Sequence, residues 1–286
     1  MIDKFFFCRI CRENTIIGKK ISVSNKYVYF KCPICHSGTL SPFPHPKVLK
    51  KYYQTQNYYL GLSEGVKNKI IQWIFTRKLF KSYDSWVQSY FSKPASILDV
   101  GTGNGEFLQS MKKAGWTVWG SDISKLAANN TNLALRDKKV IVGNFGNQKW
   151  SKKFDMVTFW HILEHEENPF NYFRKALAVL KDGGRVFGEI PNFDSPLLNL
   201  FGKSYAWVMI PVHVVYFSPK TIKYLLIKAG FKNIEIHTPT RALLNLAYSV
   251  SRNPILIFLL SPLSILIGIL LSIIRKGEVI RFTAQK

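Results

Sequence analysis

Residues 97–107 read Ile-Leu-Asp-Val-Gly-Thr-Gly-Asn-Gly-Glu-Phe, and this stretch decides the fold of the chain. A short apolar run ends near an aspartate and passes into three glycines at alternate positions, Gly101, Gly103 and Gly105. Such a run bounded by glycine is typical of a buried strand, and residues 106–115 have helical periodicity. Glycine also lets a backbone approach a ligand closely. The stretch therefore predicts a strand, a tight turn and a helix, with a ligand at the turn.

Strand-like and helical segments alternate on both sides of this turn, from residue 95 onward. Strand-like apolar runs lie at residues 96–100, 117–123, 140–145, 155–160, 184–190, 231–238 and 277–285. Helical segments separate several of them, including 106–115, 168–184 and 219–229. This alternation predicts an α/β fold with a doubly wound sheet that is parallel in its first five strands.

The spacing of the glycines argues against a dinucleotide as the ligand. A dinucleotide-binding turn has its third glycine three residues after the second, and a pyrophosphate then lies at the helix start. Here the third glycine is Gly105, and Glu106 would repel a pyrophosphate. Asp99 can instead face the cationic end of a ligand that carries an amino-acid group and a sulfonium. Asp122 can accept hydrogen bonds from two ribose hydroxyls, so these residues predict S-adenosylmethionine (SAM).

Three motifs carry a resemblance to a known family. They are DVGTGNG at residues 99–105, FDMVTFWHILEHEENP at 154–169 and HVVYFSPKTIKYLLIKAGF at 213–231. With these motifs the chain resembles class I SAM-dependent methyltransferases. It is similar to ubiquinone-biosynthesis O-methyltransferases and to methyltransferases of surface-polysaccharide gene clusters. The resemblance implies a seven-stranded sheet of order 3-2-1-4-5-7-6, mostly parallel, whose seventh strand is antiparallel.

The residues of the site follow from the glycine turn and from the resemblance. The expected cofactor contacts are Asp99, Gly101, Thr102, Gly103, Gly105, Asp122, Ile123, Asn144, Phe145 and Trp160. Asn144 stands where the family often has an aspartate. His161 and His213 are the candidates for the base that takes a proton from the acceptor. Glu164 and His165 are expected to brace the local turn. No metal is expected in the active site, because His161 replaces an acid that such a site would use.

All four cysteines lie in the first 35 residues, as the pairs Cys8-x-x-Cys11 and Cys32-x-x-Cys35. Two such pairs can place four thiolates around a tetrahedral zinc ion. Two disulfides or redox pairs are the alternatives. The amino terminus has no signal-peptide pattern, which predicts a cytoplasmic protein with reduced thiols. We expect a structural zinc in a ribbon over residues 1–45.

The rest of the chain divides into a connector and a larger domain. Residues 46–94 read as a helical connector, with one or two amphipathic helices at 63–93, and residues 95–286 form the methyltransferase-like domain. The net charge of +23 suits a polyanion or an anionic membrane as partner. The basic residues are scattered, so a general surplus of surface lysine explains the charge equally well.

An apolar insertion at 242–276 contains residues 254–274, which carry no charge and are long enough to span a bilayer. The strand expected at 277–285, however, has to return to a sheet in the cytoplasm. We therefore expect a helical hairpin, broken at Pro262, that associates with the inner face of the cell membrane. A core or dimer contact is the alternative.

The sequence favours methyl transfer to a small or lipid-linked acceptor, such as a sugar of a surface glycan or a polyprenylated ring. One rival is an RNA-modifying methyltransferase that binds phosphate backbone through its ribbon and its basic surface. Another is a binding module on an inactive methyltransferase fold, which the presence of the glycines, Asp99 and Asp122 disfavours.

Overall fold

The computed structural model describes residues 5–16, 20–22, 24, 26–45, 47–49, 82–205, 207–240, 250 and 253–286. The chain forms two compact units. Unit 1 contains residues 1–49, 161–173 and 188–284, and unit 2 contains residues 50–160, 174–187 and 285–286. The helices predicted from residue 63 lie outside the described residues up to position 81, and residues 82–88 are helical. The predicted domain boundaries after residues 45 and 94 stay predictions.

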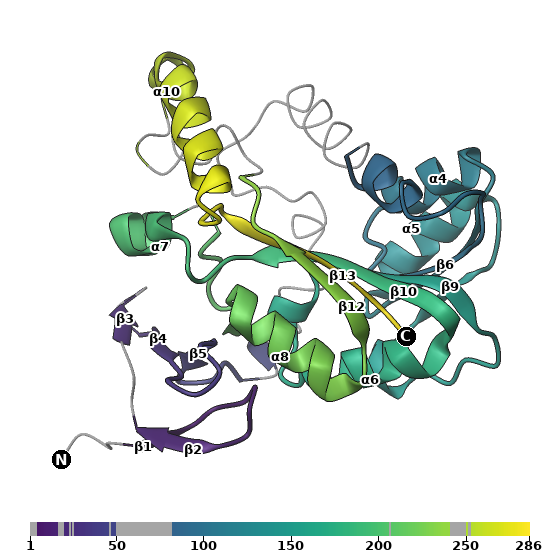
Figure 1. The fold of residues 1–286 in the computed structure, drawn as a ribbon, viewed down its shortest axis with the longest axis horizontal. Coiled ribbons are helices and arrows are strands. Elements are labelled where there is room, and N and C mark those ends of the chain that lie inside the picture. The colour runs from purple at the N-terminus through teal and green to yellow at the C-terminus, as the bar shows by residue number, and fades with distance from the viewer. Residues whose placement is uncertain are drawn as a thin grey trace. The chain divides into compact units, whose positions relative to one another are not determined.

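A seven-stranded sheet is the central element of the fold (Figure 1). Its strands are β6 (Ser96–Val100), β7 (Thr117–Asp122), β8 (Val140–Val142), β9 (Phe154–Trp160), β10 (Leu180–Pro191), β12 (Lys232–His237) and β13 (Val279–Gln285). They lie in the order β12-β13-β10-β9-β6-β7-β8. Read from β8 and counted along the chain, this is 3-2-1-4-5-7-6, so the predicted order is confirmed.

The sheet is mixed, as the sequence predicts. Strand β6 pairs in parallel with β7 and with β9, and β7 pairs in parallel with β8. Strand β13 runs in the opposite direction to β10. The amide of Asn192 donates to the carbonyl of Glu278 at 2.8 Å, and the amide of Lys286 donates to the carbonyl of Gly184 at 2.9 Å. Residue numbers fall on one strand as they rise on the other, which is the antiparallel pattern.

Helices connect strands of the sheet. They are α4 (Glu106–Lys113), α5 (Lys125–Leu135), α6 (Pro169–Val179), α7 (Pro196–Phe201), α8 (Pro219–Ala229) and α10 (Pro254–Ile273). Helix α8 begins with a capping box, in which Ser218 and Thr221 bond each other's backbone. It ends at Gly230, whose φ of 100° is accessible to glycine at little cost. Local sequence therefore sets the bounds of this helix.

The amino-terminal ribbon shares a sheet with a strand far along the chain. Its strands are β1 (Phe5–Phe7), β2 (Asn14–Ile16), β3 (Lys20–Ser22), β4 (Val28–Lys31) and β5 (Gly38–Ser41). Strand β11 (Val215–Tyr216) pairs antiparallel with β5 and completes a four-stranded sheet of order β11-β5-β4-β3. The ribbon is therefore part of the core of unit 1, where Tyr29 packs edge-on against Tyr216 at 4.8 Å.

The segment that the sequence predicted as a hairpin is one continuous helix, α10. Pro262 lies inside this helix and has no N–H to donate to the carbonyl of Phe258. The hydroxyl of Ser261 donates to that carbonyl at 2.7 Å, so the carbonyl keeps a partner and the helix continues. In the described part of the chain, no helix meets the length and hydropathy that a membrane crossing requires.

Candidate functional site

The glycine turn between β6 and α4 has a backbone conformation that favours glycine. The φ angles are 79° at Gly101, 53° at Gly103 and 78° at Gly105. A Cβ at Gly105 would lie 2.6 Å from Cγ2 of Thr131, so a side chain at this position would force Thr131 to move. A Cβ at Gly103 would meet no described atom within 4 Å. The backbone at Gly103 therefore borders open space that a ligand can fill.

Asp99 is the penultimate residue of β6 and carries a buried carboxyl group. Its side chain is 2% exposed, and the hydroxyl of Thr158 donates to its Oδ1 at 2.6 Å. Burial raises the pKa of Asp99 to about 7, against the hydrogen bond from Thr158 and with some help from the negative charge of Asp122. A positive charge beside this group would favour the carboxylate form. The site is therefore suited to a cationic ligand.

Asp122 fastens the end of β7 to the glycine turn. Its Oδ2 accepts the amide of Gly103 at 3.0 Å, and its Oδ1 accepts the amide of Ser124 at 2.8 Å. Burial raises its pKa. Each carboxylate oxygen has a second lone pair, so both can still accept a hydroxyl of a ligand. Nearby in the turn, the buried hydroxyl of Thr102 has no hydrogen-bond partner among the described residues.

The other expected cofactor contacts differ in their surroundings. Ile123 is 54% exposed, which suits an apolar side chain that a ligand covers. The amide oxygen of Asn144 accepts the backbone N–H of Gly146 and caps a short 3-10 turn. The ring of Phe145 is buried against Phe159.

Trp160 ends β9 with its ring packed into the core of unit 2. The ring stacks on Tyr83 with centroids 4.0 Å apart. Its Nε1 is buried and has no partner in the part of the chain that the structure describes. The indole therefore has an unused donor, although most of its ring serves packing.

His161 follows β9 directly and lies between two buried carboxylates. Its Nδ1 is 3.3 Å from Oε1 of Glu164, and its Nε2 is 3.6 Å from Oε1 of Glu189. The ring stacks on Trp207 with centroids 4.9 Å apart. Burial alone would lower the pKa of His161, but the hydrogen bonds and negative charges of Glu164 and Glu189 raise it to about 9. At neutral pH this side chain is therefore an imidazolium.

His213 lies in a second group of histidines and has the opposite character. It is 2% exposed, and burial lowers its pKa to about 3. Its Nδ1 lies 3.0 Å from the carbonyl of Trp207 and 3.1 Å from the hydroxyl of Tyr216. Glu164, His165 and His213 each offer a ligand atom within 4.8 Å of the others, which is an arrangement that could hold a metal ion.

Three residues of the cluster around His161 and Glu189 were not predicted from the sequence. They are Glu189 in β10, Arg281 in β13 and Trp207. Nε of Arg281 lies 3.1 Å from Oε2 of Glu189, so this buried carboxylate is shared between two cations. A signal existed in β13, where Arg281 is the single charged residue, because a charge inside a strand is rarely buried without a partner.

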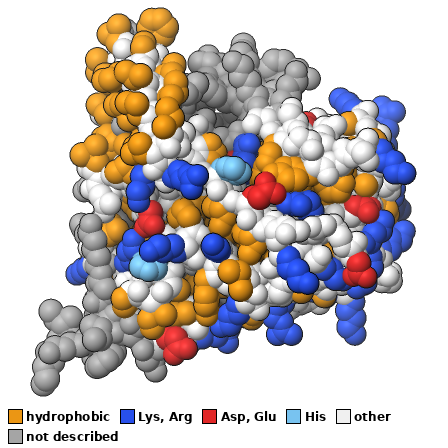
Figure 2. Space-filling model, viewed as in Figure 1, with side chains coloured by type: hydrophobic (Ala, Val, Ile, Leu, Met, Phe, Trp, Pro, Cys, Tyr) orange, Lys and Arg blue, Asp and Glu red, His pale blue; other side chains and the backbone are white. Residues whose placement is uncertain are grey.

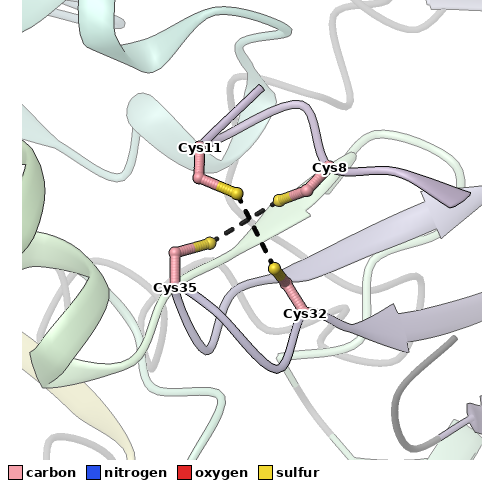
Figure 3. A group of neighbouring side chains, drawn as sticks. All are labelled: Cys8, Cys11, Cys32 and Cys35. Carbon is pink, nitrogen blue, oxygen red and sulfur yellow. Dashed lines mark hydrogen bonds between the residues drawn. The ribbon is translucent and has the colours of Figure 1, made fainter. Parts of the chain in front are cut away.

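The four cysteines converge from two hairpins of the ribbon (Figure 3). The Sγ atoms of Cys8 and Cys35 are 3.6 Å apart, and those of Cys11 and Cys32 are 3.7 Å apart. Tetrahedral zinc with Zn–S bonds of about 2.3 Å places its sulfurs about 3.8 Å apart, whereas a disulfide needs about 2.05 Å. All four thiols are free and buried. The spacing therefore fits a zinc ion rather than disulfides.

Comparisons with known proteins agree with this geometry. Residues 75–236, more than half of the chain, match the family described as a methyltransferase domain. A ubiquinone biosynthesis O-methyltransferase of Ralstonia nicotianae is 30% identical over 135 residues, which are 44% of this chain and 57% of that protein. The corresponding protein of Coxiella burnetii is 28% identical over 132 residues, or 42% and 54% of the two chains. The chain thus spans about half the length of the curated relatives it matches.

Solved structures show the same fold at low identity. A SAM-dependent methyltransferase from Archaeoglobus fulgidus has a TM-score of 0.54 at 22% identity, covering 73% of this chain and 94% of that one. The 1,6-didemethyltoxoflavin-N1-methyltransferase of Burkholderia thailandensis, crystallised with its substrate and S-adenosylhomocysteine, has a TM-score of 0.54 at 14% identity and covers 94% and 99%. Sheet order and glycine turn together define a class I SAM-dependent methyltransferase fold. The chain belongs to the methyltransferase-domain family.

Proposed function

We propose that the protein transfers a methyl group from SAM to a small or lipid-linked acceptor. The observation that carries this proposal is the glycine turn, where open space borders Gly103, the amide of Gly103 donates to Asp122, and the buried hydroxyl of Thr102 has no partner among the described residues. SAM supplies a methyl group on a sulfonium that is already activated. The chain then has to bind the cofactor, orient the acceptor and take up a proton.

His161 is the stronger candidate for the base. A base has to be neutral before it accepts a proton, and a pKa of about 9 leaves about 1% of His161 neutral at pH 7. That fraction grows with pH, and the neutral form is a strong base. His213 is neutral throughout this range, but its pKa of about 3 makes it a weak base. We assign proton uptake to His161 and a structural role to His213.

Calorimetry tests the cofactor assignment. We expect the purified protein to bind SAM and S-adenosylhomocysteine with micromolar affinity and to bind no NAD. Asp122→Ala should weaken SAM binding at least tenfold, because the variant loses both the expected ribose contact and the anchor of the glycine turn. Asp137→Ala, on the surface of the same unit, is the matched control. Binding of NAD without binding of SAM would contradict the proposal.

Helix α10 supports an acceptor or partner at a membrane surface. Many of its large apolar side chains are exposed, which is unlike the usual pattern of a water-exposed helix (Figure 2). The exposed residues are Leu256, Phe258, Leu259, Leu263, Leu266, Ile269, Leu270 and Ile273. The inward positions include Ser264 and Gly268, and the hydroxyl of Ser272 accepts the amide of Thr240 at 2.7 Å. Exposed Arg275 and Lys276 follow the helix and suit anionic headgroups.

We therefore propose peripheral association of α10 with the inner face of the cell membrane, lying in the interface rather than crossing the bilayer. A flotation assay with vesicles of phosphatidylcholine and phosphatidylglycerol tests this. Transfer of a leucine side chain from water is worth about 1.5–3 kcal/mol, so Leu263→Ser with Leu266→Ser should weaken binding at least a hundredfold. The control is Leu126→Ser with Leu133→Ser, two exposed leucines of α5. Equal loss in both variants, or no flotation of the wild type, would contradict the membrane role.

We also propose that the four cysteines hold one structural zinc ion. The sulfur distances support it, and a site closed by four thiolates has no open position for catalysis.

The alternative function is RNA modification, which the net charge of +23 would favour. Variants that lose RNA binding and methyl transfer together would favour RNA modification over transfer to a lipid-linked acceptor.

A further inference from the structure

Folding gathers lysines and tryptophans that are separate in the sequence. They line a pocket of about 220 Å³ in unit 2, here named the lysine–tryptophan pocket, formed by Trp119, Lys138, Lys139, Ile141, Lys149, Trp150, Ser151 and Lys152. Two loops supply most of these residues, one before β8 and one before β9. The pocket thus involves the amino ends of these strands, whereas the glycine turn and Asp122 lie at the carboxyl ends of β6 and β7. The pocket is separate from the cofactor site.

The pocket has a large excess of positive charge. Lys139 pairs with Asp137 at 3.0 Å. Lys138, Lys149 and Lys152 have no acidic partner within the described ranges. Ammonium groups are donors without any acceptor capacity. The pocket therefore offers several donors that an anion can satisfy.

Two of the lysines converge on one ring. Nζ of Lys139 lies 5.2 Å from the centroid of Trp119, and Nζ of Lys152 lies 4.9 Å from the same centroid. Cation–π attraction holds each ammonium there, but two like charges near one ring repel each other. An anion bound beside these ammonium groups would offset this repulsion.

Trp150 adds an independent sign of a missing ligand. Its ring packs edge-on against Phe154 with centroids 5.5 Å apart. Its Nε1 is buried and has no hydrogen-bond partner among the residues that are described. A buried donor without a partner is unfavourable, and hydrogen bonds to a charged acceptor are among the stronger ones. Trp150 lines the pocket, so an oxyanion that this donor reaches there would supply that acceptor.

We propose that the lysine–tryptophan pocket binds a phosphate group, as a phosphomonoester or a diphosphate. The volume of about 220 Å³ is below the roughly 300–1,000 Å³ of sites that enclose a drug-sized ligand, so the pocket takes the charged group rather than a whole nucleotide. The excess of ammonium groups selects a group with more than one negative charge. This phosphate site is separate from the proposed methyl-transfer site, and the proposal does not depend on methyl transfer.

Calorimetry with inorganic pyrophosphate at low salt tests the proposal. We expect submillimolar binding by the wild type and at least tenfold weaker binding by Lys149→Gln with Lys152→Gln. The matched control is Lys220→Gln with Lys223→Gln, which removes the same charge from the exposed face of α8. Trp150→Phe keeps the ring and the charge but removes the donor, and should weaken binding at least fivefold. Unchanged SAM binding by each variant shows that unit 2 is folded.

Two further arms identify the source of the phosphate. In the first arm, vesicles with a phosphomonoester headgroup compete with pyrophosphate for the wild type and for Trp150→Phe. Competition that is seen for the wild type and lost for Trp150→Phe would identify a lipid as the source. Without such competition, a soluble phosphate ester is the source. Absence of pyrophosphate binding, or an equal loss in the Lys220/Lys223 control, would overturn the proposal. Weakened binding of single-stranded RNA in Trp150→Phe, with pyrophosphate binding unchanged, would also overturn it.

Discussion

SAM binding should depend on pH because Asp99 is buried at the glycine turn. Burial raises its pKa from an ordinary value of 3.8 to about 7. The carboxylate of Asp99 attracts the cationic end of SAM. Below pH 7 the side chain of Asp99 is mostly protonated, so it has to lose its proton before SAM binds. We expect affinity to rise as the pH increases toward 7 and to level off above it.

The size of the effect follows from that pKa. Each pH unit below the pKa costs about 1.4 kcal/mol, which is about a tenfold change in affinity. Binding should therefore be about tenfold weaker at pH 6 and about a hundredfold weaker at pH 5 than on the plateau. The unliganded protein should show the opposite trend in stability. The folded pKa lies above the unfolded one, so the contribution of Asp99 to stability falls as the pH rises from about 4 to 7.

Calorimetric titration of SAM between pH 5 and pH 8 measures this dependence. Asp99→Asn keeps an acceptor for the hydroxyl of Thr158 but cannot ionise. This variant should bind weakly with little pH dependence. Asp137→Asn changes a half-buried carboxylate of the same unit, away from the glycine turn, and should keep the wild-type slope. A flat wild-type profile, or the wild-type slope in Asp99→Asn, would refute the assignment of the pH dependence to Asp99.

The remaining predictions concern the zinc site, His161 and the glycine turn. Metal analysis should find about one zinc per chain, lost in Cys32→Ser without loss of SAM binding; zinc-free protein with disulfides would contradict this. NMR titration should assign a pKa near 9 to the histidine resonance that disappears in His161→Gln, and titration near 6.5 would argue against the paired carboxylates. Gly105→Ala should lower the free energy of unfolding by about 1–3 kcal/mol, because its Cβ meets Thr131 in a backbone region that side chains rarely adopt. Gly103→Ala, where the Cβ has space, should cost less stability in a urea titration but should block SAM.

A doubly wound sheet, parallel in its first five strands, was predictable from the residue pattern, whereas the strand order and the antiparallel seventh strand came from the family resemblance. The glycines at 101, 103 and 105 require their backbone conformation locally, and the alternation of strands and helices leaves few topologies for a parallel sheet. The two cysteine pairs were equally informative, because ligand spacing within each pair is a local property. These features need no knowledge of distant contacts.

The electrostatic character of the histidines depended on the tertiary structure. Glu189 lies far from His161 in sequence, and it is their contact in the fold that helps raise the histidine pKa to about 9. His213 has a similar sequence context, yet burial lowers its pKa to about 3. A side-chain pKa reflects solvent exposure and neighbouring charges, and neither can be read from a local motif.

The pairing of β11 with the ribbon, the continuity of α10 and the lysine–tryptophan pocket were also decided by the fold. In α10, the hydroxyl of Ser261 replaces the donor that Pro262 lacks, which a pattern of apolar residues does not reveal. In the pocket, lysines that look scattered along the chain converge on Trp119. Periodicity and spacing determine which segments form strands, helices and turns. Which side chains then share a buried or charged environment is determined by contacts between residues far apart in sequence.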